Sequence, residues 1–318
     1  MTVWIFTHGD GDGICASSLA LAANPSARLF FTHPYGLLED LEQTENGDTV
    51  IICDIALSQA HLGNLIDKFA EIEDEGFIYY FDHHPLPEDF NVEDIPGNIY
   101  HQTGSSASEI VYTFFKDKID VLQSRAAIYG AISDYMDNTP TVLSLLKMWD
   151  KRAIYLETGI LVQSLPLLKR EYDFKRDVVK DLSSGKPPSS NERLVKLAIQ
   201  QARKEEEAIK NIRGEIEVTG KVAYVLDFSF PLGKAAIYAR ALTGTLVGVA
   251  GETRGKIIDM SIRAVGEFID LNMILRKVAP KLGGSGGGHP LAAGARIPKE
   301  NFYKLISKIN ESIEEIDF

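Results

Sequence analysis

The sequence is poor in cysteine and has no long apolar run. Its 318 residues include two cysteines, Cys15 and Cys53, too few for a disulfide framework, so we expect a reducing, cytoplasmic setting. No apolar stretch approaches the ~20 residues that a membrane helix needs, which excludes a membrane-spanning class. The N-terminus has neither a basic region nor a cleavage-like site, so we expect no signal peptide.

Positive charge is also scarce in the first third of the chain. Residues 1–100 hold 2 Lys or Arg and 18 Asp or Glu, a net charge of −16, whereas residues 101–318 have a net charge of +4. The total of −12 argues against a nucleic-acid partner when it is taken as an average. Because the acid is concentrated in one part, however, that average describes neither part of the chain.

The length and the apolar pattern predict an α/β protein of about two domains. Hydrophobic residues make up 45% and charged residues 25% of the chain, which is ordinary globular composition. We predict a mostly parallel, doubly wound N-terminal sheet domain, a helical connector and a smaller α/β C-terminal domain. The expected boundaries are 1–185, 186–213 and 214–318.

Short apolar runs mark the expected strands. In the N-terminal domain these strands are Val3–Thr7, Arg28–Thr32, Thr49–Cys53 and Phe77–Phe81. In the C-terminal domain we expect strands near 222–228, 245–251 and 256–264, followed by a glycine-rich loop at 283–289. A charged helical pattern over 191–212 predicts the connector.

Three of the four N-terminal strands run into carboxylate and imidazole side chains. In an open α/β sheet, ligands bind beyond the carboxyl ends of the strands, so these side chains should gather in one place. Taken alone, each group has an ordinary explanation, such as a solvated turn or a helix N-cap, but their joint occurrence at three strand ends disfavours coincidence. The residues are His8, Asp10 and Asp12 after the first strand, Asp54 after the third, and Asp82, His83 and His84 after the fourth.

This side-chain set predicts a two-metal centre. Carboxylates a few ångströms apart raise one another's pKa unless a cation neutralises them. Carboxylates and imidazoles without cysteine suit manganese or a similar divalent ion better than a cysteine-rich zinc site. The groups outnumber the ligands of one ion, so we expect two ions sharing a bridging carboxylate, an arrangement that mainly serves phosphate-ester hydrolysis.

The motifs resemble those of a known superfamily. The segments 8–13, Asp54, 82–84 and 130–134 resemble, in order, the four motifs of the DHH phosphoesterase superfamily, and 286–294 resembles the signature of its DHH-associated C-terminal domain. Within the superfamily the sequence looks most similar to archaeal RecJ-like nucleases, above all the Hef-associated 3′–5′ exonuclease. Its compact length is also similar to that of nanoRNases.

The resemblance implies a role for each motif residue. His8, Asp10 and Asp54 would hold one ion, and Asp12, Asp54, His83 and Asp134 the other. Asp82 would orient an imidazole and His84 would face the phosphate, so both are expected catalytic residues. His8 is the least secure ligand, because some branches place three residues rather than Gly9 alone before the first aspartate.

The expected substrate-binding residues come from three places. Arg263 matches a family arginine that contacts phosphate, and backbone N–H groups of a glycine run that ends at His289 can cradle an oxyanion. The helix that begins near Ser105 and Ser106 can bind phosphate at its N-terminus, or it is closed by a capping box with Glu109. The predicted set is Arg263, Gly286, Gly287, Gly288, His289, Ser105 and Ser106.

The predicted function is metal-dependent phosphodiester hydrolysis, with a 3′–5′ exonuclease on single-stranded DNA or RNA favoured. The alternative is an enzyme for very short substrates: a nanoRNase, a 3′-phosphoadenosine 5′-phosphate phosphatase or a cyclic-dinucleotide phosphodiesterase. We expect two divalent ions, manganese favoured over magnesium or cobalt. Expected partners are single-stranded nucleic acid or a short oligonucleotide, a repair or replication protein such as a Hef-like helicase, and a second copy of the chain. A non-catalytic scaffold is disfavoured because every ligand position is filled.

Overall fold

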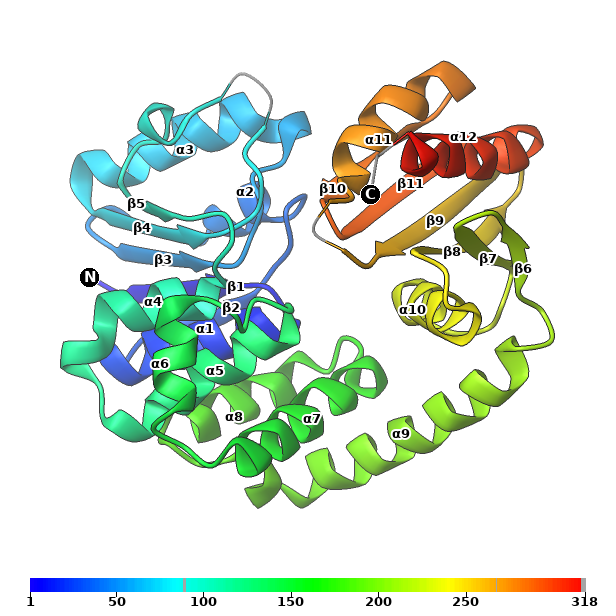
Figure 1. The fold of residues 1–318 in the computed structure, drawn as a ribbon. Helices are drawn as coiled ribbons and strands as arrows, with labels where there is room; N and C mark the ends of the chain where they lie inside the picture. The colour runs from blue at the N-terminus through cyan, green and yellow to red at the C-terminus, as the bar shows by residue number, and fades with distance from the viewer. Residues whose placement is uncertain (88–89, 267, 316–318) are drawn as a thin grey trace. The chain divides into compact units, whose positions relative to one another are not determined.

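The computed structural model describes residues 1–87, 90–266 and 268–315 and divides into two compact units (Figure 1). Unit 1 comprises Met1–Ala202, and unit 2 begins at Arg203. The division falls inside helix α9 (Glu192–Ile212), in the segment expected to be a connector. The predicted α/β fold class is confirmed, whereas the predicted domain boundaries stay a prediction.

Unit 1 is built on a five-stranded parallel sheet. Its strand order is β2-β1-β3-β4-β5, with β1, β3 and β4 adjacent at the centre. The strands are β1 (Val3–Thr7), β2 (Arg28–Phe31), β3 (Thr49–Cys53), β4 (Phe77–Asp82) and β5 (Asn98–His101).

Helices cover both faces of this sheet, as Figure 1 shows. Successive strand residues point to opposite faces, so Trp4 and Phe6 pack in one core with Leu65 of α3, whereas Ile5 packs in the other core with Ile14 of α1. Apolar side chains thus pack on both faces, as expected for a sheet covered on both sides. The helices are α1 (Gly11–Ala23), α2 (Leu37–Leu41), α3 (Leu62–Glu75), α4 (Ala107–Phe115), α5 (Ser124–Ser133), α6 (Pro140–Leu146), α7 (Lys151–Leu168) and α8 (Tyr172–Ser183).

Two elements of unit 1 were not expected from the sequence. Strand β5 has only four residues and lies at the sheet edge, where no continuous apolar run is needed. Helix α8 is rich in charge and buries only Lys175, Val178, Val179 and Leu182, so its apolar stripe is weak. Both elements nevertheless flank the candidate site.

Unit 2 is a six-stranded mixed sheet in the order β10-β11-β9-β8-β7-β6. Its strand pairs are antiparallel except for β7 and β8, which are parallel. Helices α11 and α12 share a core with one face, and α10 packs against the other (Figure 1). The elements are β6 (Glu217–Thr219), β7 (Val222–Leu226), α10 (Leu232–Thr243), β8 (Val247–Arg254), β9 (Ile257–Ala264), α11 (Leu271–Val278), β10 (Ser285–His289), β11 (Ala292–Pro298) and α12 (Phe302–Glu314).

The glycine-rich segment corrects one expectation. Instead of a loop, Ser285–His289 forms the edge strand β10, paired antiparallel with β11. Gly284, just before β10, lets the two backbones approach closely. A Cβ atom at this position would lie 2.1 Å from the carbonyl oxygen of Arg296. The sequence favoured a loop here because glycines give no alternation of apolar and polar side chains that would indicate a strand.

No helix within residues 1–87, 90–266 and 268–315 has the length and apolar character needed to cross a membrane.

Candidate metal centre

The carboxyl ends of β1, β3 and β4 meet at one edge of the sheet. Thr7 is paired with Cys53, and Cys53 is paired with Phe81, so the residues that follow these strands leave the sheet at the same level. The chain reverses its direction of strand addition between β1 and β3, which is where open α/β sheets bind ligands. The strand order therefore brings together the three motifs that the sequence placed at strand ends.

Asp54 lies at the middle of this cluster. Its side chain is buried, and neither carboxylate oxygen receives a hydrogen bond from the described residues. Burial, followed by the charges of Asp10, Asp12 and Asp134, raises the pKa of Asp54 well above its usual range. The backbone is strained as well, with φ at +59° in the left-handed region, a conformation that carboxylates at functional sites tolerate.

One group of ligand atoms surrounds the ring of His83. Its Nε2 atom lies 3.4 Å from Oδ1 of Asp54, 3.4 Å from Oδ2 of Asp134 and 4.0 Å from Oδ2 of Asp12. Asp134 reaches the group from the C-terminal end of α5. Burial lowers the pKa of His83, but the hydrogen bond with Asp134 and the surrounding carboxylates raise it overall.

Asp12 is held by the N-terminus of α4. Its Oδ2 accepts the Ala107 N–H at 2.6 Å and its Oδ1 accepts the Ser108 N–H at 3.0 Å. Even so, burial and the charge of Asp134 raise the pKa of Asp12 to about 7. The N-terminus of α4 thus stabilises the ionised form of Asp12, which burial and the charge of Asp134 destabilise.

Ser105 and Ser106, which we expected to bind substrate, lie at the N-terminus of α4, the same helix end that holds Asp12. Both serines are buried, and the Ser106 hydroxyl accepts the Glu109 N–H at 3.1 Å as an N-cap. The N–H groups of Ala107 and Ser108 donate hydrogen bonds to Asp12, so this helix N-terminus holds a candidate metal ligand. The Glu109 carboxylate accepts the Thr139 hydroxyl instead of completing a capping box.

His8, Asp10 and Asp54 form the second group. His8 donates from Nδ1 to Oδ2 of Asp10 at 2.7 Å, and Oδ1 of Asp10 accepts the Gly13 N–H at 3.0 Å as the N-cap of α1. Burial opposes ionisation of Asp10, but the hydrogen bond from His8 holds its pKa below the usual range. The same bond raises the pKa of His8.

The expected catalytic pair is connected by hydrogen bonds. His84 donates from Nδ1 to Oδ1 of Asp82 at 2.8 Å, and its Nδ1 lies 4.0 Å from Oδ1 of Asp54. The other oxygen of Asp82 accepts the Tyr80 hydroxyl at 3.0 Å, and the ring of His101 donates to the His84 carbonyl oxygen at 2.6 Å. Asp82 thus fixes the tautomer and the orientation of the His84 ring at the edge of the centre.

Lys175 is a residue of the site that sequence reasoning missed. It lies on α8, is 5% exposed, and donates from Nζ to the carbonyl oxygen of Gly9 at 2.5 Å. Burial lowers its pKa, while the charge of Asp10 opposes the shift. No local signal in the sequence marks it, because its partner Gly9 lies 166 positions away.

The donor atoms fit divalent cations. Asp12, Asp54, His83 and Asp134 offer ligand atoms that lie within 4.8 Å of one another, and so do His8, Asp10 and Asp54. Asp54 belongs to both groups and to a third, with His83 and His84, and its two buried oxygens lack hydrogen bonds from described residues. A cation would satisfy those oxygens and offset the charge repulsion that raises the pKa of Asp12 and Asp54.

The remaining expected substrate residues lie together in unit 2. Arg263 of β9 is paired with Ala292 of β11, and Ala292 is paired with His289 of β10, so the three share one register position across adjacent strands. Arg263 donates to the Ser261 hydroxyl at 2.8 Å.

The glycines Gly286, Gly287 and Gly288 belong to the ladder of β10, and the Gly288 N–H donates to Oδ1 of Asn272 at 3.1 Å. A glycine oxyanion cradle at this strand is therefore at most partial.

Tyr135 occupies a position that favours glycine. It follows Asp134 with φ at +59° and is 77% exposed. The Met136 N–H donates to the Ala131 carbonyl oxygen and the Tyr135 N–H to that of Ile132, which is the pattern of a Schellman helix end.

We expect Tyr135→Gly to raise the free energy of unfolding by about 0.5–1 kcal/mol, because glycine relieves the left-handed strain at some cost in chain entropy. Chemical denaturation in a chelating buffer measures the difference. Tyr135→Ala is the matched control, because it removes the ring and keeps the strain. Equal stability of the alanine and glycine variants would contradict the strain argument.

Sequence and structure comparisons agree with this geometry. Residues 2–139 match the DHH family, N-terminal domain, and residues 220–315 match the DHHA1 domain. A search of curated proteins finds no match.

Among solved structures, an exonuclease RecJ bound to manganese has a TM-score of 0.62 at 14% identity, over 99% of this chain and 91% of its own. RecJ in complex with Mn²⁺ from Thermus thermophilus has a TM-score of 0.65 at 14% identity, over 99% of this chain but 52% of its own length.

A third similar structure is the pGpG-specific phosphodiesterase PggH from Vibrio cholerae. It has a TM-score of 0.61 at 14% identity, and the match covers 98% of this chain and 99% of that one. At such identities the likeness shows the shared fold. A DHH family N-terminal domain over residues 2–139 followed by a DHHA1 domain over residues 220–315 supports the DHH phosphoesterase superfamily as the family of this chain.

Proposed function

We propose that this protein is a metal-dependent phosphodiesterase with two ions in its centre, and that it acts as a 3′–5′ exonuclease on single-stranded DNA or RNA. The observation that carries the proposal is Asp54, a buried carboxylate without a hydrogen bond from described residues, shared by two groups of ligand atoms. One group is His8, Asp10 and Asp54; the other is Asp12, Asp54, His83 and Asp134. Shared-carboxylate centres of this kind serve in-line displacement at phosphate.

When bound, divalent ions would supply charge neutralisation at the phosphate and activation of water. The residues around the centre would do the remaining work. Asp82 holds the ring of His84 in one orientation beside Asp54, where an imidazole can stabilise charge on a phosphate oxygen or assist a leaving group. Lys175 holds the Gly9 carbonyl oxygen and so positions the backbone between His8 and Asp10.

Residues of unit 2 would bind substrate phosphate. Arg263 supplies a guanidinium suited to phosphate, and His289 shares its register position. The similarity to an exonuclease RecJ bound to manganese supports a nucleic-acid substrate, and a second RecJ structure is also in complex with Mn²⁺. Manganese is accordingly the metal we propose first, ahead of magnesium or cobalt.

A second candidate is hydrolysis of very short substrates. The chain spans about half the length of the Thermus RecJ chain, whereas the match covers 99% of the pGpG-specific phosphodiesterase. Enzymes of this second kind are a nanoRNase, a 3′-phosphoadenosine 5′-phosphate phosphatase and a cyclic-dinucleotide phosphodiesterase. A role in DNA repair with a Hef-like helicase, membership of the archaeal branch, a cytoplasmic location and a homo-oligomer also stay proposals.

Single-stranded DNA and RNA oligonucleotides of about 2 to 30 residues, labelled at either end, test both candidates. With Mn²⁺ present we expect stepwise shortening from the 3′ end, and no cleavage after the metal is removed by chelation. Cleavage of only the shortest oligonucleotides would select the second candidate. No cleavage of any substrate with Mn²⁺, Mg²⁺ or Co²⁺ would contradict the proposed function.

A further inference from the structure

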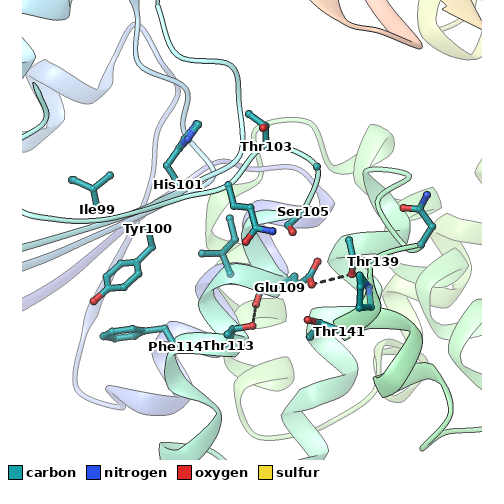
Figure 2. Close-up of a pocket in the computed structure, with 15 residues that line it drawn as sticks. Ile99, Tyr100, His101, Thr103, Ser105, Glu109, Thr113, Phe114, Thr139 and Thr141 are labelled. Atoms are coloured by element: carbon teal, nitrogen blue, oxygen red, sulfur yellow. Dashed lines mark hydrogen bonds between the residues drawn. The ribbon is translucent and has the colours of Figure 1, made fainter. Parts of the chain in front are cut away.

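An open pocket of about 880 Å³ lies on unit 1, beyond the carboxyl end of β5 (Figure 2). Its volume is in the range of small-molecule sites. Three segments form its walls: the end of β5 with the loop that follows, one side of α4, and the start of α6. The lining residues that matter here are Tyr100, His101, Glu109, Phe114, Thr139 and Thr141.

Each wall is continuous with part of the candidate metal centre. On the β5 side, His101 donates to the carbonyl oxygen of His84 at 2.6 Å. The loop then leads into α4, whose first N–H group donates to Asp12 at 2.6 Å. The third wall begins four residues after Asp134. A substrate with its phosphate at the centre would therefore extend its neighbouring group along these walls.

The lining does not suit a second phosphate. None of the described residues that line the pocket is lysine or arginine, and Glu109 is the one carboxylate among them. The rest are apolar or neutral polar groups, such as the rings of Tyr100 and Phe114 beside the hydroxyl groups of Thr113 and Thr141. A nucleoside presents the same combination, with flat apolar faces, polar edges and no charge.

Glu109 gives the pocket a preference for hydrogen-bond donors. Its Oε1 atom accepts the Thr139 hydroxyl at 2.9 Å, as Figure 2 shows, while its buried Oε2 atom has no partner among the described residues. A carboxylate oxygen accepts hydrogen bonds, so Oε2 is an atom of the pocket wall that lacks a donor. A nucleoside offers two kinds, the amino group of a base and the hydroxyl groups of a ribose.

We propose that this pocket binds the nucleoside adjacent to the scissile phosphate, with Glu109 as the acceptor for its amino or hydroxyl donor. The inference rests on the proposed phosphodiesterase function and adds the part of the substrate that sets specificity. The carboxylate also ties α4 to the segment after Asp134 through Thr139, so nucleoside binding and alignment of the centre share one residue.

The test compares two substrates on the same enzyme preparations. The dinucleotide pApA carries nucleosides, whereas bis(p-nitrophenyl) phosphate carries none. The measured quantity is kcat/KM for pApA divided by kcat/KM for bis(p-nitrophenyl) phosphate. In Glu109→Gln we expect this ratio to fall at least about tenfold, the scale of one lost hydrogen bond to a charged group. In Thr141→Trp, which fills the pocket, we expect a fall of at least the same size. Glu73→Gln, the same exchange on the exposed surface of α3, is the matched control and should keep the wild-type ratio.

Two further arms identify the donor. A larger loss for pApA than for pUpU assigns the amino group of the base, and a larger loss for ribo- than for deoxyribodinucleotides assigns the sugar hydroxyl. Wild-type ratios in both pocket variants would overturn the inference while leaving the proposed function standing. If the wild-type enzyme hydrolyses neither substrate, the proposed function itself fails.

Discussion

Asp54→Asn is expected to lower kcat/KM for phosphodiester hydrolysis at least ~1,000-fold, the scale of losing metal-based charge stabilisation. Asparagine keeps the size of the side chain and tolerates the left-handed backbone at φ +59°, so the chain should still fold. One neutral amide oxygen cannot replace a carboxylate shared by both ligand groups. Steady-state assays with saturating Mn²⁺ measure the effect.

Thermal unfolding separates loss of the site from loss of the fold. Without metal, Asp54→Asn should melt at or above the wild-type temperature, because a neutral amide replaces a carboxyl group whose ionised form is disfavoured by burial and by the neighbouring carboxylates. The rise in melting temperature that Mn²⁺ gives the wild-type protein should disappear. Asp67→Asn, on the neighbouring helix α3, is a matched control that should behave as wild type. Retained activity in metal-saturated Asp54→Asn would contradict the assignment.

The second large effect is a dependence of metal affinity on pH. Asp12, with a pKa of about 7, is partly protonated near neutrality in the metal-free protein, and the raised pKa of Asp54 acts in the same direction. A cation must displace those protons, so each one released makes the affinity fall about tenfold per pH unit below the pKa. Calorimetric titration with Mn²⁺ should therefore show affinity at least about tenfold weaker at about pH 6 than at about pH 8, with protons released on binding.

Stability of the metal-free protein should change in the opposite sense. Asp12 binds its proton more tightly when folded than when unfolded, so its contribution to stability is lost as pH rises from about 4 through 7. His83, whose pKa is also raised, loses its contribution as it deprotonates, which adds to the same trend. Urea unfolding in a chelating buffer should give a lower free energy at about pH 8 than at about pH 5.5, and Asp12→Asn should reduce that difference. An unchanged difference in Asp12→Asn would contradict the role given to Asp12.

The candidate metal centre could be predicted from the sequence because it depends on local patterns, namely apolar strands followed by carboxylate and imidazole side chains. The apolar runs predicted β1 and β3 with the bounds that the structure has, and β4 to within one residue. Parallel pairing then determines where Asp54 and the residues after β1 and β4 lie, since the carboxyl ends of neighbouring strands share an edge. Two of the three groups of candidate ligand atoms around Asp54 have the members that the family resemblance implies, whereas the third, Asp54 with His83 and His84, was not expected. The roles of these residues stay predictions until metal is measured.

The features that sequence reasoning missed depend on contacts between distant segments. Lys175 meets the Gly9 carbonyl oxygen across 166 positions, and no local pattern reports such a pair. The N–H groups that hold Asp12 come from α4, 95 and 96 positions away, where the sequence predicted a helix N-terminus that binds phosphate or is closed by a capping box. The glycine run at β10 has no side-chain period, so its pairing with β11 could not be distinguished from a loop.

The central claim is that Asp54 is the shared ligand of two divalent ions. An anomalous difference map from a crystal soaked with Mn²⁺ tests it most directly, because each bound ion gives its own peak. The account predicts two peaks, one among His8, Asp10 and Asp54 and one among Asp12, Asp54, His83 and Asp134. A single ion at full occupancy that does not touch Asp54, or none at millimolar Mn²⁺ and about pH 8, would contradict it.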